Sequence, residues 1–216
     1  MLTEITELPE TKRKLVDAGV KLMRVKGYNA TSVDEICLDA GVTKGGFFHY
    51  FKSKEDLAQT AMSDFREKRL LDMANAPFRK LADPLDRIFA RLDYVKSSQE
   101  GLSPSARGCL VGMFAQELAS TNPEFRRACL DSFRQSAKDF EKDLTEAKAL
   151  YAPKAEFDPE KLASLYVSLY QGSKMISKTL DSHQILSDNL DQFRLCLEAL
   201  FGRMGKGGKS AGKSRG

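Results

Sequence analysis

Basic and aromatic side chains surround two adjacent glycines between residues 43 and 54, and their types suit the recognition of phosphate. Gly45 and Gly46 each weaken a helix by up to about 1 kcal/mol relative to alanine, so helix stability does not explain them. Close approach of the backbone to a partner would explain both. The side chains nearby that can donate hydrogen bonds to phosphate oxygens are those of Lys44, His49, Tyr50, Lys52 and Lys54. This pattern indicates a helix that lies in a groove of DNA. The alternative is a helical hairpin whose basic face is simply solvated.

Two short helices are expected to position this cluster. Ser32 is followed three residues later by a glutamate, which is the spacing of a capping box, so a helix should span residues 33–40. Gly41 can adopt the positive φ of a tight turn at no steric cost. Thr43 is a good N-cap for a second helix over residues 44–51. Two short helices joined by such a turn form the helix-turn-helix pattern.

Residues 12–57, and above all the segment GVTKGGFFHYFKSKEDL, resemble the DNA-binding domain of the tetracycline-repressor (TetR) family of bacterial transcriptional regulators. The rest of the chain fits that family by its length and helical character. The resemblance implies a regulator rather than an enzyme, which binds double-stranded DNA at a palindromic operator as a homodimer. Repression, relieved by a small-molecule inducer, is the commoner mode of action in the family.

The resemblance also assigns roles to individual residues. It implies contacts to base edges from Lys44, Gly45, Gly46 and Phe48, and contacts to phosphates from Thr31, Ser32, Thr43, His49, Tyr50 and Lys54. Phe48 stands where the family more often has tyrosine. A phenylalanine can contact only a thymine methyl group or a sugar at that point, without a hydrogen bond.

The composition narrows the class of protein. A chain of 216 residues with 42% hydrophobic and 30% charged residues predicts a soluble protein of one large or two modest domains. No apolar run approaches the roughly 18 residues of a membrane span, and the N-terminal segment MLTEITELPE is acidic, unlike a signal peptide. We therefore expect a cytoplasmic protein without a membrane partner. The four cysteines lack any CxxC spacing, and neither a metal site, a cofactor nor a catalytic triad is predicted.

Helical periodicity continues through the rest of the chain, and no stretch alternates with period two, so we predict an all-α fold of about nine helices. The expected helices after the helix-turn-helix span about 54–74, 84–99, 107–119, 125–149, 159–180 and 188–201, and a first helix precedes it at about 10–26. We predict a helix-turn-helix DNA-binding domain over residues 1–60 and a ligand-binding and dimerisation domain over residues 61–202. A disordered basic tail is predicted over residues 203–216.

The last two helices are the expected dimer elements. Both carry apolar stripes that are too broad for a solvent face, and Gly172 permits close approach of a second helix. In the family the corresponding helices form a four-helix bundle across the twofold axis. The alternative is that these stripes only complete the core of the monomer.

The resemblance further implies an inducer pocket between the helices of the C-terminal domain. The candidate lining residues are Phe89, Phe114, Glu117, Phe133, Tyr166 and Tyr170, although aromatic stripes are more often plain core. Cys109 is a separate candidate, because a cysteine beside Arg107 at a helix start can have a lowered pKa and react with an electrophile. Some regulators in the family with a similar GCL segment are thiol-based sensors, and an inert buried cysteine is the alternative.

Two other classes of function compete with this interpretation. Residues 207–214, GGKSAGKS, match the P-loop pattern GxxxxGK[ST] and would suggest a nucleotide-binding protein. A P-loop must follow a strand and open a helix, yet no strand precedes this segment and the chain stops at Gly216, so we interpret it as a basic tail. The other class is a helical protein-interaction module without specific DNA binding.

Overall fold

The computed structural model describes residues 8–101 and 108–203. This part of the chain contains no strand. Its helices are α1 (Glu10–Lys26), α2 (Val33–Ala40), α3 (Lys44–Tyr50), α4 (Lys54–Asn75), α5 (Pro84–Ser97), α6 (Leu110–Glu117), α7 (Pro123–Tyr151), α8 (Pro159–Leu180) and α9 (Gln184–Phe201), with a short 3-10 helix at Pro77–Lys80. The predicted all-α fold is confirmed. None of the described helices is both long and apolar enough to cross a membrane.

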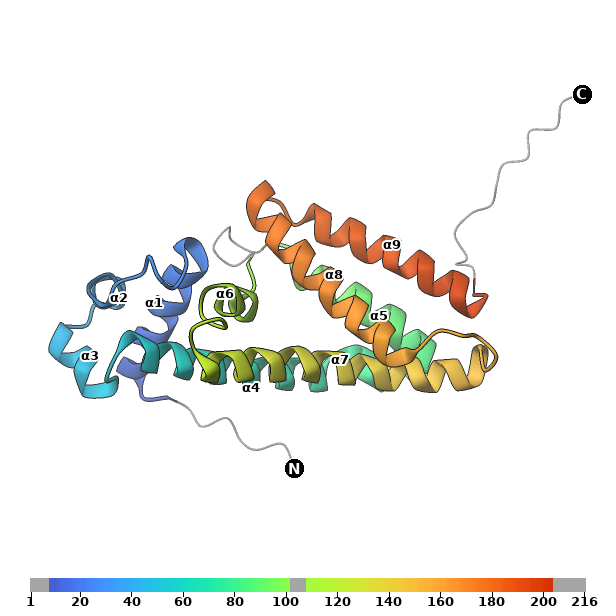
Figure 1. Cartoon of the computed structure of the whole chain (residues 1–216), viewed down its shortest axis with the longest axis horizontal. Helices are drawn as coiled ribbons and strands as arrows, with labels where there is room; N and C mark the ends of the chain where they lie inside the picture. Colours follow the sequence, from blue (N-terminus) through green and yellow to red (C-terminus); the bar gives the residue numbers. More distant parts are fainter. Residues whose placement is uncertain (1–7, 102–107, 204–216) are drawn as a thin grey trace, which may run out of the picture.

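The helices form an elongated molecule with α1, α2 and α3 at one end (Figure 1). Helices α4 and α7 run along its length, and α5, α8 and α9 lie toward the other end. The bidentate ion pair between Arg13 of α1 and Asp64 of α4, with N–O distances of 2.8 and 2.7 Å, fixes the middle of α4 to the first helix. Helix α4 therefore connects the helix-turn-helix directly to the rest of the molecule.

Local capping sets the two helices of the helix-turn-helix. The Ser32 hydroxyl accepts a hydrogen bond from the Glu35 N–H at 3.2 Å, and the Glu35 carboxylate accepts one from the Ser32 N–H at 2.9 Å. Gly41 ends α2 with φ of 63°, the left-handed conformation that glycine adopts without steric cost. The Thr43 hydroxyl accepts from the Gly46 N–H at 3.1 Å and caps α3. The predicted capping box, turn and N-cap are all present.

One hydrophobic core joins the helix-turn-helix to α6 and the first turns of α7. It contains Phe47 of α3 and Met62 of α4 together with Phe114 of α6 and Phe125 of α7, all of them buried. The rings of Phe114 and Phe125 lie 5.1 Å apart. The predicted domain division at residue 60 is therefore not marked by a break in this core.

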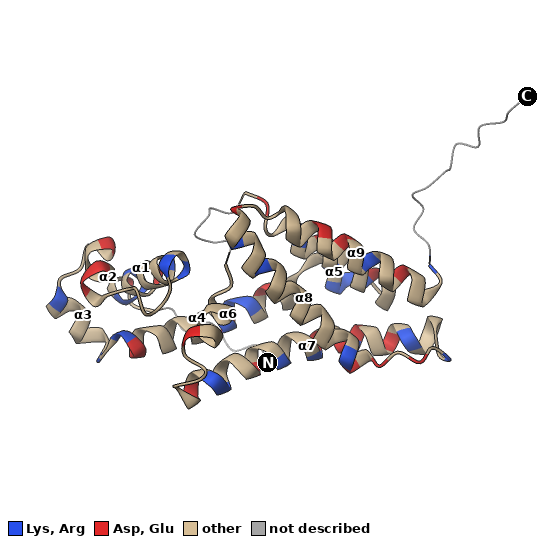
Figure 2. Cartoon of the chain, turned by 45° about the horizontal axis from the view of Figure 1, so that its top comes forward, with Lys and Arg blue, Asp and Glu red and all other residues tan. Residues whose placement is uncertain are grey.

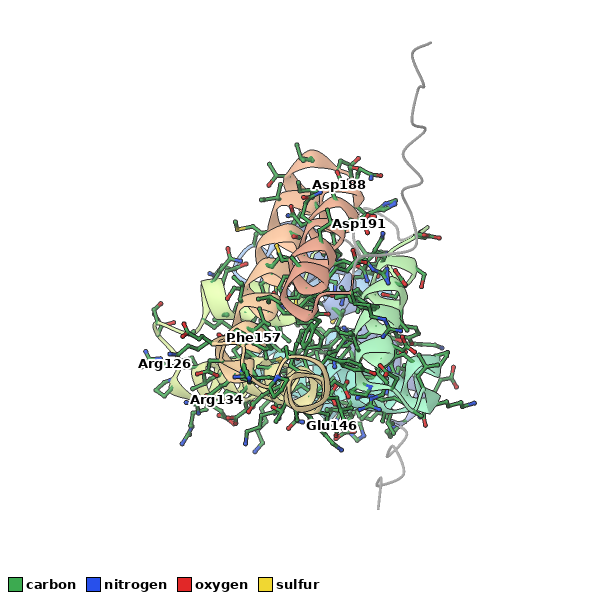
Figure 3. The ribbon with its side chains drawn as sticks, turned by 90° about the vertical axis from the view of Figure 1, so that its right-hand side faces the viewer. Arg126, Arg134, Glu146, Phe157, Asp188 and Asp191 are labelled. Atoms are coloured by element: carbon green, nitrogen blue, oxygen red, sulfur yellow. The ribbon has the colours of Figure 1, made fainter. Side chains whose placement is uncertain are left out.

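A second core lies among α5, α7, α8 and α9, where α7 and α8 make the most extensive helix contact. The view along the molecule shows α9, with Asp188 and Asp191, on the opposite side of this core from Arg134 and Glu146 of α7 (Figure 3). Phe157, in the loop after α7, closes the end of the core by packing edge-on against Phe201 at 5.5 Å.

Three predicted boundaries are corrected by the structure. Helix α6 begins at Leu110 rather than 107 and ends at Glu117, so Cys109 is the residue before the helix. Helix α9 begins at Gln184, one turn before 188, and this turn buries Leu186. Arg203, predicted as the start of the tail, lies within 3.1 Å of Asp86. The remaining tail, with GGKSAGKS, lies outside the described residues.

Candidate nucleic-acid interface and ligand cavity

Helix α3 has one buried face and one open face. Phe47 is fully buried and packs against Phe51 with ring centroids 5.6 Å apart, which anchors the helix to the core. Phe48 points the other way and is 53% exposed. The exposed surface of α3 also includes Lys44, Gly45 and His49. The residues predicted to contact bases thus lie largely on the open face of α3. Packing of Phe47 and Phe51 on the opposite face fixes the backbone of the helix.

The two glycines of α3 have different roles in the fold. A Cβ atom built on Gly45 would come no nearer than 3.9 Å to another group, the Thr43 hydroxyl. A Cβ atom on Gly46 would lie 2.8 Å from Cγ1 of Val42, a distance that real contacts do not tolerate. Packing against Val42 therefore accounts for Gly46. Close approach of a partner remains the explanation for Gly45 alone.

Charged groups around α3 alternate in sign. The Lys44 ammonium lies 2.8 Å from the carboxylate of Asp34 on α2, and both side chains are exposed. In the charge view the start of α3 is basic, and α2 beside it carries acidic positions (Figure 2). Lys44 must exchange Asp34 for a DNA acceptor when it contacts a base, and solvent screening makes such an exposed ion pair of little net value.

The predicted phosphate contacts differ in their availability. Thr43 uses its hydroxyl oxygen as an acceptor within the cap, so its O–H remains able to donate. Ser32 donates its O–H to Glu35 at 2.7 Å and must release that bond to reach a phosphate. His49 and Tyr50 pack edge to face with ring centroids 4.8 Å apart. This packing holds two potential phosphate donors side by side at the end of α3.

The prediction for Thr31 is wrong. Its side chain is only 1% exposed, and its hydroxyl donates to the carbonyl oxygen of Gly27 at 2.7 Å. A buried and already bonded hydroxyl cannot reach a phosphate, so Thr31 instead secures the loop between α1 and α2. A hydroxyl four residues after a helix-terminating glycine was the sequence signal for this role.

Lys54 is largely committed to the same loop. Its ammonium donates to the carbonyl oxygens of Tyr28 at 2.8 Å and Thr31 at 2.7 Å, and it lies 4.2 Å from the centre of the Tyr28 ring. Partial burial lowers the pKa of this lysine. Two of its three N–H donors are therefore in use, and a phosphate contact from the third stays a prediction.

Two predicted ligand residues lie at the junction with the DNA-binding helices, where Glu117 borders a small cavity and Phe114 borders none. Glu117 accepts hydrogen bonds from the backbone N–H groups of Tyr28 at 3.1 Å and Asn29 at 2.8 Å, which occupies both carboxylate oxygens. Phe114 is fully buried and stacks edge-on to Tyr28 at 6.2 Å. Both side chains are directed away from the large cavity because α6 packs its second half on the loop between α1 and α2.

Phe89 is also misplaced by the sequence prediction. It belongs to the second core and contacts the guanidinium of Arg194, whose carbon lies 4.9 Å from the ring centre. Phe89 lines neither of the two cavities that lie between the helices. The aromatic spacing that suggested it is a core pattern of α5.

A cavity of about 580 Å³ lies between α4, α7 and α8, and it is closed at one side by the residues around Cys109. Four predicted residues line it, namely Cys109, Phe133, Tyr166 and Tyr170. The other apolar lining side chains are those of Phe65, Leu70, Met73, Val111 and Val167. This volume is in the range of small-molecule sites, which run from about 300 to 1,000 Å³.

Sequence reasoning missed the arginines of this cavity. Arg66 and Arg69 of α4 line it, as do Arg79 and Arg91 with Asp139 between them. Asp139 lies 2.8 Å from Arg91 and also pairs with Arg79. The spacing of Arg66, Arg69 and Met73 on one face of α4 is the sequence signal that could have found them.

A second cavity of about 210 Å³ adjoins the first. Cys109 and Gln171 line both, so they separate the two spaces. The second cavity is lined by polar and charged groups from α1, α6 and α8, which include Arg24, Glu117, Lys174 and Lys178. Cys109 is thus the one predicted residue that faces both an apolar and a cationic space among the described residues.

The nearby Cys129 differs from Cys109. Cys129 is 2% exposed, and its thiol donates to the carbonyl oxygen of Val111 at 3.6 Å. Burial raises the pKa of this thiol to about 11, so it stays protonated and unreactive at neutral pH. Cys109 is half-buried and is the accessible thiol of the pair.

Comparison with known proteins gives the same assignment over almost the whole chain. Residues 15–61 match the model of the bacterial regulatory proteins of the tetR family, and residues 84–193 match a tetracyclin repressor-like C-terminal domain. The chain is 33% identical over 175 residues to the transcriptional regulator AcuR of Cereibacter sphaeroides, covering 77% of this chain and 75% of that protein. It is 28% identical over 198 residues to the transcriptional repressor DhaR of Mycobacterium sp. strain GP1, covering 88% and 92% of the two chains.

Solved structures agree with the sequence relatives. The crystal structure of a regulatory protein TetR from Rhodobacter sphaeroides superposes with a TM-score of 0.72 at 28% identity, and it covers 88% of this chain and 97% of that one. The reduced form of NemR from E. coli shares the fold, with a TM-score of 0.68 at 21% identity over 86% of this chain and 96% of that one. These relatives are transcriptional regulators and not enzymes. With its helix-turn-helix and its C-terminal helical domain both matched, the chain belongs to the TetR family of DNA-binding transcriptional regulators.

Proposed function

We propose that this regulator is a repressor which binds a palindromic operator as a homodimer and is released when a small molecule enters the large cavity. Residues 1–60 bind DNA, residues 61–202 bind the ligand and the second protomer, and the protein acts in the cytoplasm. The observation that carries the proposal is the single core that connects the back of α3 to α6, beside the cavity. The naming of the similar protein DhaR as a repressor supports the sign of regulation.

Apolar residues on the outer surfaces of α8 and α9 support the dimer. The exposed large side chains of these two helices are Leu165, Met175, Ile176, Leu180, Leu195 and Leu200. A Cβ atom on Gly172 would meet no atom within 4 Å, so the fold of the monomer does not require glycine there. A second helix packed against this face would explain both features. Two α3 helices would then reach successive major grooves about 34 Å apart.

The route from ligand to DNA runs through α6. Residues before its first turn line both cavities, and its last residue, Glu117, holds the backbone of Tyr28 and Asn29 next to the helix-turn-helix. A ligand that displaces Cys109 would shift α6 along with Glu117. The two DNA-binding regions would then move out of register with the grooves, which is a shift of population between two dimer arrangements.

Modification of Cys109 by an electrophile is a second candidate trigger. It is favoured by the position of Cys109 in the walls of both cavities and by its greater accessibility than Cys129. A covalent adduct on its sulfur would occupy the same space as a non-covalent ligand. Both triggers therefore act on α6, and a Cys109→Ser variant separates them because it retains the cavity and lacks the nucleophile.

Selection of binding sites from random duplex DNA tests the proposal. We expect a palindrome with half-sites about one helical turn or slightly more apart, and its loss in Tyr50→Ala. Lys161→Ala is the control, because Lys161 is an exposed lysine on α8, far from α3 along the molecule. Recovery of no motif, with binding that depends only on salt concentration and persists in Tyr50→Ala, would contradict specific operator binding.

A further inference from the structure

The arginines of the second core are balanced by acids. Asp143 is 2% exposed and accepts from Arg87 at 2.8 Å and Arg79 at 3.5 Å. Arg91 is paired with Asp139 at 2.8 Å. Buried charges of this kind are tolerated because each has a partner of opposite sign. They provide a reference for Lys174 and Arg24, which have no acidic partner among the described residues.

Lys174 of α8 is buried without an ion pair. Lys174 is 5% exposed. Its ammonium donates a hydrogen bond at 2.6 Å to the side-chain oxygen of Gln99, which is a neutral amide. No carboxylate among the described residues forms an ion pair with it. Burial lowers its pKa to about 8, with Arg24 and Arg69 contributing in the same direction. A charged amine is thus held at the small cavity by one neutral acceptor.

Arg24 of α1 is in a similar position. Its Nε is buried and has no hydrogen-bond partner, and its guanidinium carbon lies 5.5 Å from the centre of the Phe65 ring. Burial lowers the pKa of this arginine as well. An arginine keeps its proton at physiological pH, so this N–H is open to an acceptor supplied by a ligand.

Further cations face the same space. Arg66 lines the large cavity with no described ion pair, and Arg69 beside it has only the exposed Asp72 at 3.7 Å. Of the acids nearby, Glu117 already accepts two backbone N–H groups. The excess of positive charge is therefore a property of this site.

The shape of the site matches an amphipathic ligand. The large cavity has an apolar and aromatic wall together with its arginines and Asp139. The small one presents Lys174 and Arg24 beside Glu117, and the two cavities meet at Cys109 and Gln171. Tyr170 stands at this end of the large cavity, and burial raises the pKa of its phenol to about 12, so it remains a hydrogen-bond donor.

We propose that the inducer is an organic monoanion, a carboxylate with an apolar or aromatic body, whose charged end is bound by Lys174 and Arg24. The inference rests on the proposed function, because it names the class of ligand for the same cavity. The apolar body lies against Phe133 and Tyr166, and the carboxylate takes the place of the missing acidic partner. A neutral ligand of the same shape would leave both cations unpaired.

Calorimetric titration with matched pairs of ligands tests this proposal. The probes are benzoate, phenylacetate and 4-phenylbutyrate, each compared with its primary amide, and the readouts are affinity and the melting temperature of the full-length protein. We expect at least one acid to bind about tenfold or more tightly than its amide, since a charge-assisted pair at a buried site is worth more than 1.4 kcal/mol.

Lys174→Met provides the matched variant, with Lys161→Met on the same helix as the control. Lys174→Met should remove the preference for the acid and raise the melting temperature of the ligand-free protein, because an unpaired buried charge is lost. Lys161→Met should change neither. A fall in melting temperature with the preference intact would mean that Lys174 only supports the fold, and it would overturn the proposal.

The outcome also separates this inference from the proposed function. Equal affinity for acids and amides, or no binding of any acid, would overturn the anionic ligand, while operator selection in the same preparation would still report DNA binding. Tighter acid binding in Cys109→Ser would instead identify the sulfur of Cys109 as the partner of the two cations, and it would overturn the proposal. Retention of acid binding in Cys109→Ser supports the ligand.

Discussion

The cations of α3 and the cations around Cys109 occupy opposite environments. Lys44 is exposed and already paired with Asp34 in a bond of little net value, so exchange for a DNA phosphate or base is inexpensive. Lys174 is buried, Arg24 is partly buried, and neither has an acidic partner among the described residues, so the free protein is less stable than it would be with apolar residues there. The first region is prepared for a polyanion at its surface, and the second for a small anion inside.

A core of aromatic side chains lies between these two regions, and replacing Phe114 should have the largest effect on stability. Phe114→Ala should reduce the free energy of unfolding by about 3–5 kcal/mol, because the ring is fully buried between Tyr28 and Phe125. Phe133→Ala should cost less, because that ring borders an existing cavity. Urea denaturation of both variants checks the difference, and equal losses would contradict a tightly packed junction.

Lys174 should make the free energy of unfolding depend on pH with the opposite sign to a lysine in an ordinary ion pair. Its pKa is lowered from 10.5 to about 8 in the folded protein, so between these pH values the folded state binds fewer protons than the unfolded state. The free energy of unfolding should therefore rise with pH in this window, by up to about 3 kcal/mol. Below pH 8 the charged lysine is a constant cost.

The measurement is thermal or urea unfolding from pH 7 to 10.5 for the parent protein and Lys174→Met, with the difference between them as the readout. Arg24 from α1, Arg69 from α4 and the Cys109 thiol face the same amine. The comparison is repeated in Cys109→Ser, so that the sulfur next to the amine makes no contribution to the difference. A difference that does not change with pH would mean that Lys174 is solvated rather than buried.

The two regions also differ in how far the sequence predicted them. The signals that set α2 and α3 are local, since the Ser32–Glu35 box and the Thr43 cap operate over three residues, and the observed helices follow them. The cation cluster brings together residues 24, 69 and 174, and no local pattern relates them. Aromatic spacing in α5 and α6 could not distinguish a cavity wall from core, and it wrongly selected Phe89 and Phe114.

The two glycines of α3 should respond in opposite ways to the same substitution. Gly46→Ala should lower the free energy of unfolding by about 1–3 kcal/mol, because the new methyl group would collide with Val42. Gly45→Ala should leave stability unchanged or raise it by up to about 1 kcal/mol, since the site is open and helical. We expect Gly45→Ala nevertheless to weaken operator binding, as measured by fluorescence anisotropy. Full operator affinity in Gly45→Ala would exclude close approach of DNA at this point.

Substitution of Lys44 and of Lys54 should distinguish a direct DNA contact from a positioning role. The expected effects are the smallest of those predicted for the two regions. Lys44→Ala should change stability by less than about 1 kcal/mol, reduce the salt dependence of DNA binding by about one unit of slope and relax the preference for the operator. Lys54→Ala should instead destabilise the protein, because the carbonyls of Tyr28 and Thr31 lose their donor, and should leave the slope unchanged. Binding titrations at several salt concentrations, on operator and unrelated duplexes, provide the slopes. A slope reduced by about 1 in Lys54→Ala as well would mean that its third N–H reaches a phosphate, and the loop would then be a second point of contact with the DNA backbone.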